Sequence, residues 1–66
     1  MIKDERIKKL IEIVNKYRIS PEIVAHIIGV SLTTYYRYKN GETIPQSQNT
    51  RNVIDSVIEG YTQKNK

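Results

Sequence analysis

Several hydrogen-bonding side chains fall on one face of a short helix predicted over residues 32–39. At about 100° per residue, Tyr35 and Tyr38 share one side of this helix, and the hydrogen-bonding side chains gather on the other. They are Thr33, Tyr36, Arg37 and Asn40. Arginine can donate two bonds to guanine, asparagine can pair with adenine, and threonine offers a hydroxyl and a methyl group. The pattern favours contact with the major groove of DNA, although a polar outer face is also usual for a surface helix.

The sequence offers few residues for catalytic or metal chemistry. It contains no cysteine and a single histidine, His26, and its seven carboxylates are scattered along the chain. No Ser/His/Asp set, glycine-rich phosphate loop or pair of acids is present, so we expect no enzyme activity and no metal or cofactor site. His26 falls opposite the buried side of its predicted helix, and we expect it to be solvated.

The chain is short and basic. Its 66 residues, of which 38% are hydrophobic, carry 11 Lys and Arg against 7 Asp and Glu, for a net charge of +4. This balance favours polyanionic partners, and the length allows one domain with one small core. No apolar run approaches the roughly 20 residues of a membrane span, and the start of the chain does not resemble a signal peptide. We therefore expect a single cytoplasmic domain over residues 1–66, with no membrane contact.

Two helices are predicted in the first half of the chain. Apolar residues three and four positions apart predict an amphipathic helix over residues 3–17 that ends before Ser20. Ser20 at the N-cap, followed by Pro21 at the first helical position, starts a second helix. That helix is short and stops at Gly29, since glycine readily takes the left-handed conformation found just past helix ends.

A third helix follows almost at once. Ser31 can cap the helix over residues 32–39, so only Gly29, Val30 and the cap separate the second and third helices. A turn this tight forces a steep crossing, which is typical of the helix-turn-helix motif. No alternation typical of strands is present, so the predicted fold class is all-α, with the motif over residues 20–40.

The last helix, which starts between Ser47 and Thr50, carries a wide apolar arc. At 100° per residue, its apolar side chains cover about 140°, more than one side of a small core requires. We therefore expect part of this arc to form a homodimer interface. The expected interface residues are Val57, Tyr61, Ile54 and Ile58. A frayed tail is expected over residues 62–66.

A set of residues between Ser20 and Pro45 has a spacing known from one family. The set comprises Val24-Ala25, Ile28-Gly29-Val30-Ser31, Thr34-Tyr35, Arg37-Tyr38, Asn40-Gly41 and Pro45. With these residues, the segment resembles the helix-turn-helix of the lambda-repressor and Cro family. The resemblance implies a small lambda-repressor-like bundle of four to five helices, which binds operator DNA as a dimer with its third helix in the major groove.

The resemblance also implies roles for individual residues. Base contacts are implied for Leu32, Thr33, Tyr36 and Arg37. Phosphate contacts are implied for Ser20, Thr34, Asn40 and Thr43, and further for Lys9 or Lys39. The sequence departs from the family at Pro21, where a glutamine often bonds a phosphate, and at Glu42, which replaces a commonly basic residue. A clear fifth helix is also missing.

Ile23 and Ile27 stand four apart at positions that in the family usually carry solvent-facing charges. Either a tilt of the second helix buries them against the first helix or the tail, or they contact another protein. The leading hypothesis is a homodimeric transcriptional regulator of phage, plasmid or bacterial type, such as a repressor. A protein-interaction module, for example an antitoxin or antirepressor, would instead use Ile23, Ile27 and the last helix. A recombination accessory protein would bind DNA and bend it.

Overall fold

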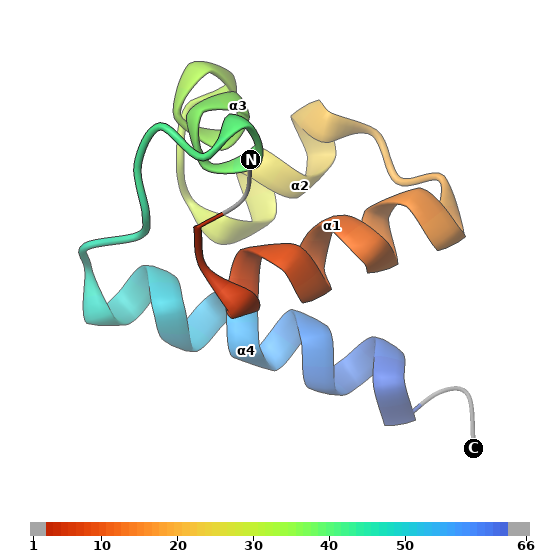
Figure 1. The fold of residues 1–66 in the computed structure, drawn as a ribbon. Helices are drawn as coiled ribbons and strands as arrows, with labels where there is room; N and C mark the ends of the chain where they lie inside the picture. Colours follow the sequence, from red (N-terminus) through yellow and green to blue (C-terminus); the bar gives the residue numbers. More distant parts are fainter. Residues whose placement is uncertain (1–2, 64–66) are drawn as a thin grey trace.

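The computed structural model describes residues 3–63, which fold into four α-helices and no strand (Figure 1). The helices are α1 (Glu5–Tyr17), α2 (Pro21–Ile28), α3 (Leu32–Asn40) and α4 (Gln48–Gln63). The predicted all-α fold class is confirmed. Among these four helices, none combines the length and the hydropathy of a membrane-spanning segment. The expected frayed tail is partly wrong, because α4 continues to Gln63; residues 64–66 lie outside the described residues.

The two ends of α1 are closed by local hydrogen bonds. The Asp4 side chain accepts a hydrogen bond from the backbone N–H of Arg6 at 2.8 Å, so the helix begins at Glu5 rather than at residue 3. At the other end Arg18 adopts the left-handed conformation, with φ 53°, and the N–H of Ile19 donates to the Val14 carbonyl at 3.0 Å. An arginine therefore occupies a helix end where glycine is usual.

A three-residue turn joins α2 to α3. Gly29 takes the left-handed conformation, with φ 77°, and the N–H of Val30 donates to the Ala25 carbonyl at 3.0 Å. The hydroxyl of Ser31 then accepts a hydrogen bond from the N–H of Thr34 at 3.1 Å. The predicted stop at Gly29 and the predicted cap at Ser31 are both confirmed.

The core is formed by side chains from all four helices. It consists of Ile7, Leu10, Ile11, Val14, Val24, Ala25, Ile28, Tyr35, Tyr38 and Ile54. Helix α1 lies between α3 and α4, which occupy opposite edges of the molecule (Figure 1). The expectation that Ile54 contributes to a dimer interface is wrong, because this side chain has no exposed surface and belongs to the core. Val57 and Ile58 are half-buried against that core.

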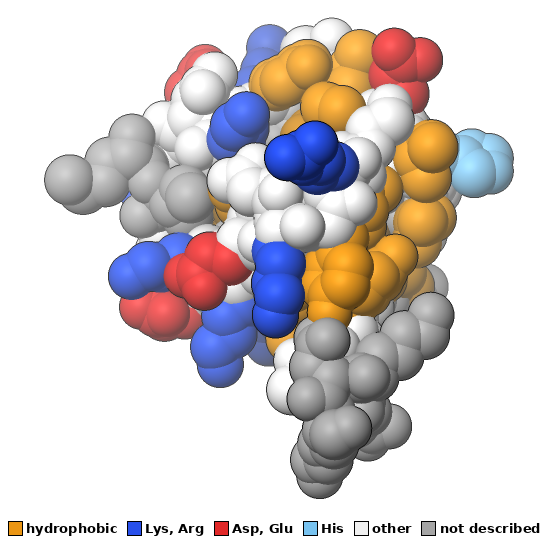
Figure 2. Space-filling view, turned by 90° about the vertical axis from the view of Figure 1, so that its right-hand side faces the viewer, with side chains coloured by type: hydrophobic (Ala, Val, Ile, Leu, Met, Phe, Trp, Pro, Cys, Tyr) orange, Lys and Arg blue, Asp and Glu red, His pale blue; other side chains and the backbone are white. Residues whose placement is uncertain are grey.

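Large apolar side chains also reach the surface of α2. Ile23 is 55% exposed and Ile27 is 48% exposed, so the tilt that would have buried them against α1 does not occur within the described residues. Figure 2 views the molecule from the side where α1 and α4 end, and hydrophobic side chains extend over much of that side. The molecule thus leaves an apolar region uncovered next to its core.

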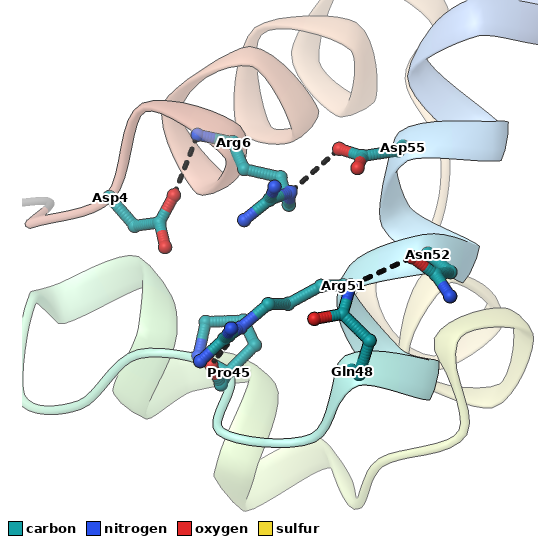
Figure 3. Close-up of polar contacts among 7 residues, drawn as sticks. All are labelled: Asp4, Arg6, Pro45, Gln48, Arg51, Asn52 and Asp55. Carbon is teal, nitrogen blue, oxygen red and sulfur yellow. Dashed lines mark hydrogen bonds and ion pairs between the residues drawn. The ribbon is translucent and has the colours of Figure 1, made fainter.

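Helices α1 and α4 run side by side in the same direction. Near the start of α1, the Arg6 Nε donates to the Asp55 carboxylate at 2.6 Å (Figure 3), and this hydrogen bond raises the pKa of the Arg6 guanidinium. Near the far end, the rings of Tyr17 and Tyr61 lie 4.8 Å apart between centroids. The two contacts therefore link α1 and α4 near both ends of α1.

Candidate nucleic-acid interface

Helix α3 is anchored by two tyrosines on its inner side. Tyr35 is 1% exposed and Tyr38 is 7% exposed, and burial raises the pKa of both phenols. These are the residues that the sequence assigned to the buried side, and this assignment is confirmed. Two rings in the core fix the rotation of α3 and therefore determine which of its side chains face outward.

The outward side of α3 carries the four residues expected to contact bases, together with Asn40, which is expected to contact a phosphate. Leu32 and Tyr36 remain 37% and 40% exposed, and Thr33, Arg37 and Asn40 are also exposed. The Arg37 guanidinium makes no ion pair or hydrogen bond with any residue between 3 and 63. Its donors are therefore available to an acceptor on another molecule. We call the surface made by Leu32, Thr33, Tyr36, Arg37 and Asn40 the α3 face.

The α3 face is positively charged at its end. Helix α3 contains Arg37 and Lys39 and no acid, and Glu42 follows the helix in the next loop. The Lys39 Nζ lies 6.0 Å from the centroid of the Tyr36 ring. At this distance the ammonium is held only weakly over the ring, so Lys39 can turn toward a phosphate beside the α3 face.

The expected phosphate-contacting residues differ in how their hydroxyl groups are used. Ser20 occupies the N-cap position of α2, but its side chain makes no capping hydrogen bond, so its hydroxyl is not needed by the helix. The Thr34 hydroxyl is already bonded to the Ser31 hydroxyl at 2.9 Å and is half-buried. The Thr43 hydroxyl makes only a long 3.5 Å contact to the Ile44 carbonyl. Ser20 and Thr43 therefore fit an external phosphate better than Thr34 does.

The structure separates Lys9 from the other residues of this set. Lys9 lines an open hollow together with Tyr61 and Thr62, which belong to the end of α4. That end of α4 lies on the opposite edge of the molecule from α3 (Figure 1). Lys9 therefore points away from the α3 face, and the expected phosphate contact is not supported for this residue.

One positioning residue was not found from the sequence. The Arg51 Nε donates to the Pro45 carbonyl at 3.0 Å, which ties the loop after α3 to the first turns of α4 (Figure 3). This bond restrains the loop that carries Thr43. No sequence signal marks it, because a spacing of six residues across a loop has no fixed geometry.

Comparisons of the chain with protein-family models, with curated proteins and with solved structures gave no match. The ligand of the α3 face is therefore inferred from the chemistry and geometry of its own residues.

Proposed function

We propose that this protein is a sequence-specific double-stranded DNA-binding protein of the helix-turn-helix type, acting as a homodimeric transcriptional regulator. The observation that carries the proposal is the α3 face. A guanidinium without a partner among residues 3–63, a hydroxyl and two partly exposed apolar groups project from a helix whose rotation is fixed by two buried tyrosines.

Base reading would be shared between polar and apolar groups. Arg37 supplies the two parallel donors that suit guanine O6 and N7, and each such pair discriminates against a wrong base by about 1–3 kcal/mol. Thr33 offers a hydroxyl and a methyl group, and Leu32 at the start of α3 can contact a thymine methyl. Tyr36 adds one more hydroxyl to the same face.

Phosphate contacts would position α3 without reading sequence. The Ser20 hydroxyl, which makes no capping bond, lies at the start of α2. Lys39 lies near the end of α3, and Thr43 lies in the loop that follows. Glu22, in the first turn of α2, carries a negative charge that repels a phosphate at this position. The net charge of +4 makes the overall attraction to DNA favourable and dependent on salt.

A dimer would present two α3 helices to the same face of the duplex. Two recognition helices in successive major grooves lie about 34 Å apart, one turn of DNA. Matched helices related by a two-fold axis read a palindrome, so the preferred site should contain two inverted half-sites.

Selection of bound sequences from a random DNA pool tests the proposal. We expect enrichment of a palindromic site with half-sites one helical turn apart. The double variant Thr33→Ala/Arg37→Ala serves as the control, because it keeps Tyr35 and Tyr38 and should fold normally but enrich no defined site. Absence of enrichment by the unaltered protein would contradict the proposal.

The exposure of Ile23 and Ile27 supports a second candidate, a protein-binding module such as an antitoxin or antirepressor. In that case DNA affinity would be weak and insensitive to sequence, and the same selection would enrich nothing. The selection therefore separates the two candidates.

A further inference from the structure

Within residues 3–63, the large exposed apolar side chains divide into two pairs on different helices. Leu32 and Tyr36 belong to the α3 face, whereas Ile23 and Ile27 lie on α2. The two isoleucines are one helical turn apart and therefore adjacent on the α2 surface. They are also the most exposed of the four, so the proposed DNA contact does not account for them.

Ile27 is continuous with apolar residues of α1 and α4. It lines one hollow together with Ile13 of α1 and with Val57 and Tyr61 of α4, and the other residues lining this hollow are also apolar. Figure 2 shows the hydrophobic side chains gathered on this side of the molecule. We call the surface made by Ile13, Ile23, Ile27, Val57 and Tyr61 the three-helix apolar surface.

We infer that the three-helix apolar surface binds a second copy of this chain through a two-fold axis. The charges beside it favour this occupant. Lys9, Glu12 and Lys16 line the neighbouring hollow that also contains Tyr61. Because a two-fold axis brings the same surface of both copies together, a rim with both signs can pair with itself.

The position of the surface suits the proposed function, on which this inference rests. Tyr61 lies at the end of α4, on the opposite edge of the molecule from α3 (Figure 1), whereas Ile23 and Ile27 lie on α2, which packs against α3. The three-helix apolar surface and the α3 face share no residue, so pairing through the first can leave both α3 faces free to contact DNA.

The surface is small, so the dimer should be weak without DNA. A standard interface covers about 800 Å² per partner, and the whole chain exposes 4615 Å². Five side chains, three of them half-buried, supply less than the standard area. We expect dissociation in the micromolar range, with DNA binding adding to the stability of the pair.

Sedimentation without DNA, over a range on the order of 10–100 µM, tests the inference. The unaltered chain should approach twice its mass of 7.7 kDa. Ile27→Glu and Ile23→Glu should remain at the monomer mass with unchanged helical circular dichroism. Leu32→Glu is the matched control, since it places the same charge at an exposed apolar residue of α3 and should leave the dimer intact. The dimer dissociation constant should rise at least tenfold in the α2 variants only.

Each other outcome overturns the inference. It fails if the unaltered chain is a monomer over this range, which would leave the surface for a different protein. Unchanged dimerisation of both α2 variants, or loss of the dimer in Leu32→Glu, places the contact elsewhere. Unfolding of both α2 variants also contradicts it, because the residues would then be needed for the monomer core. Base preference at a single half-site is measured for Ile23→Glu and Ile27→Glu. If that preference persists while dimerisation is unaffected, only this inference fails.

Discussion

The two serines that precede α2 and α3 allow a direct test of how α3 is held. Both occupy N-cap positions with extended backbone conformations. The Ser31 hydroxyl accepts from the Thr34 N–H at 3.1 Å, whereas the Ser20 side chain makes no capping bond. Ser31→Ala should therefore destabilise the fold, and Ser20→Ala should do so much less.

The expected difference follows from the size of a capping bond. Loss of a serine N-cap costs about 1 kcal/mol, within a range of roughly 0.5–2 kcal/mol. Unfolding entropy near 60 °C is about 2.1 cal/mol/K per residue, or about 140 cal/mol/K for this chain. Ser31→Ala should thus lower the melting temperature by about 7 °C. Ser20→Ala should lower it by no more than about 2 °C, because no hydrogen bond is lost.

Thermal melts followed by circular dichroism at equal protein concentration measure this difference. Ser20→Ala should instead weaken binding to all DNA sequences alike, since its hydroxyl is proposed to contact phosphate. Equal shifts in melting temperature for the two variants, or a larger shift for Ser20→Ala, would refute the claim that, of these two serines, only Ser31 forms a capping hydrogen bond.

Two further predictions concern the stability of the fold. Arg18→Gly should raise the melting temperature by several degrees. Arg18 adopts the left-handed conformation, which is less favourable by about 1 kcal/mol for a residue that has a Cβ atom than for glycine. An unchanged or lower melting temperature in thermal melts would contradict this prediction. Burial raises the pKa of Tyr35 and Tyr38, so the unfolded chain loses these phenolic protons more readily, and stability should fall as the pH rises above about 10. Urea titrations between about pH 8 and 11 should show a smaller fall in the free energy of unfolding for Tyr35→Phe than for the unaltered protein. An equal fall in the two proteins would contradict the claim that the buried Tyr35 phenol causes it.

Local signals in the sequence predicted the ends of α2 and the start of α3. Gly29 and Ser31 act through hydrogen bonds to residues within five positions, so their geometry is set by the chain itself. Arg18 was not recognised as a helix end, because an arginine there carries no glycine-like signal. Ser20 matches the pattern of an N-cap, but its backbone and side-chain rotation decide whether the bond forms.

The environment of individual surface residues depended on contacts far apart in the sequence. The spacing of apolar residues predicted the apolar arc of α4. Which of them are buried depends on how α4 packs on α1: Ile54 faces the core, whereas Val57 stays partly exposed. The same packing directs Lys9 toward the end of α4. The α3 face was easier to predict, because Tyr35 and Tyr38 fix its rotation from within the helix.

The most direct measurement compares Arg37→Ala with Lys9→Ala, two changes that each remove one positive charge. Affinities are measured for the best selected site and for all its single-base changes, at several salt concentrations. Arg37→Ala should cost about 1–3 kcal/mol and relax the preference at one base pair per half-site. Lys9→Ala should leave the preferred sequence and the salt dependence unchanged, because Lys9 points away from the α3 face. Uniform weakening of all sites by Arg37→Ala, with no position relaxed, would contradict the claim that α3 reads DNA sequence.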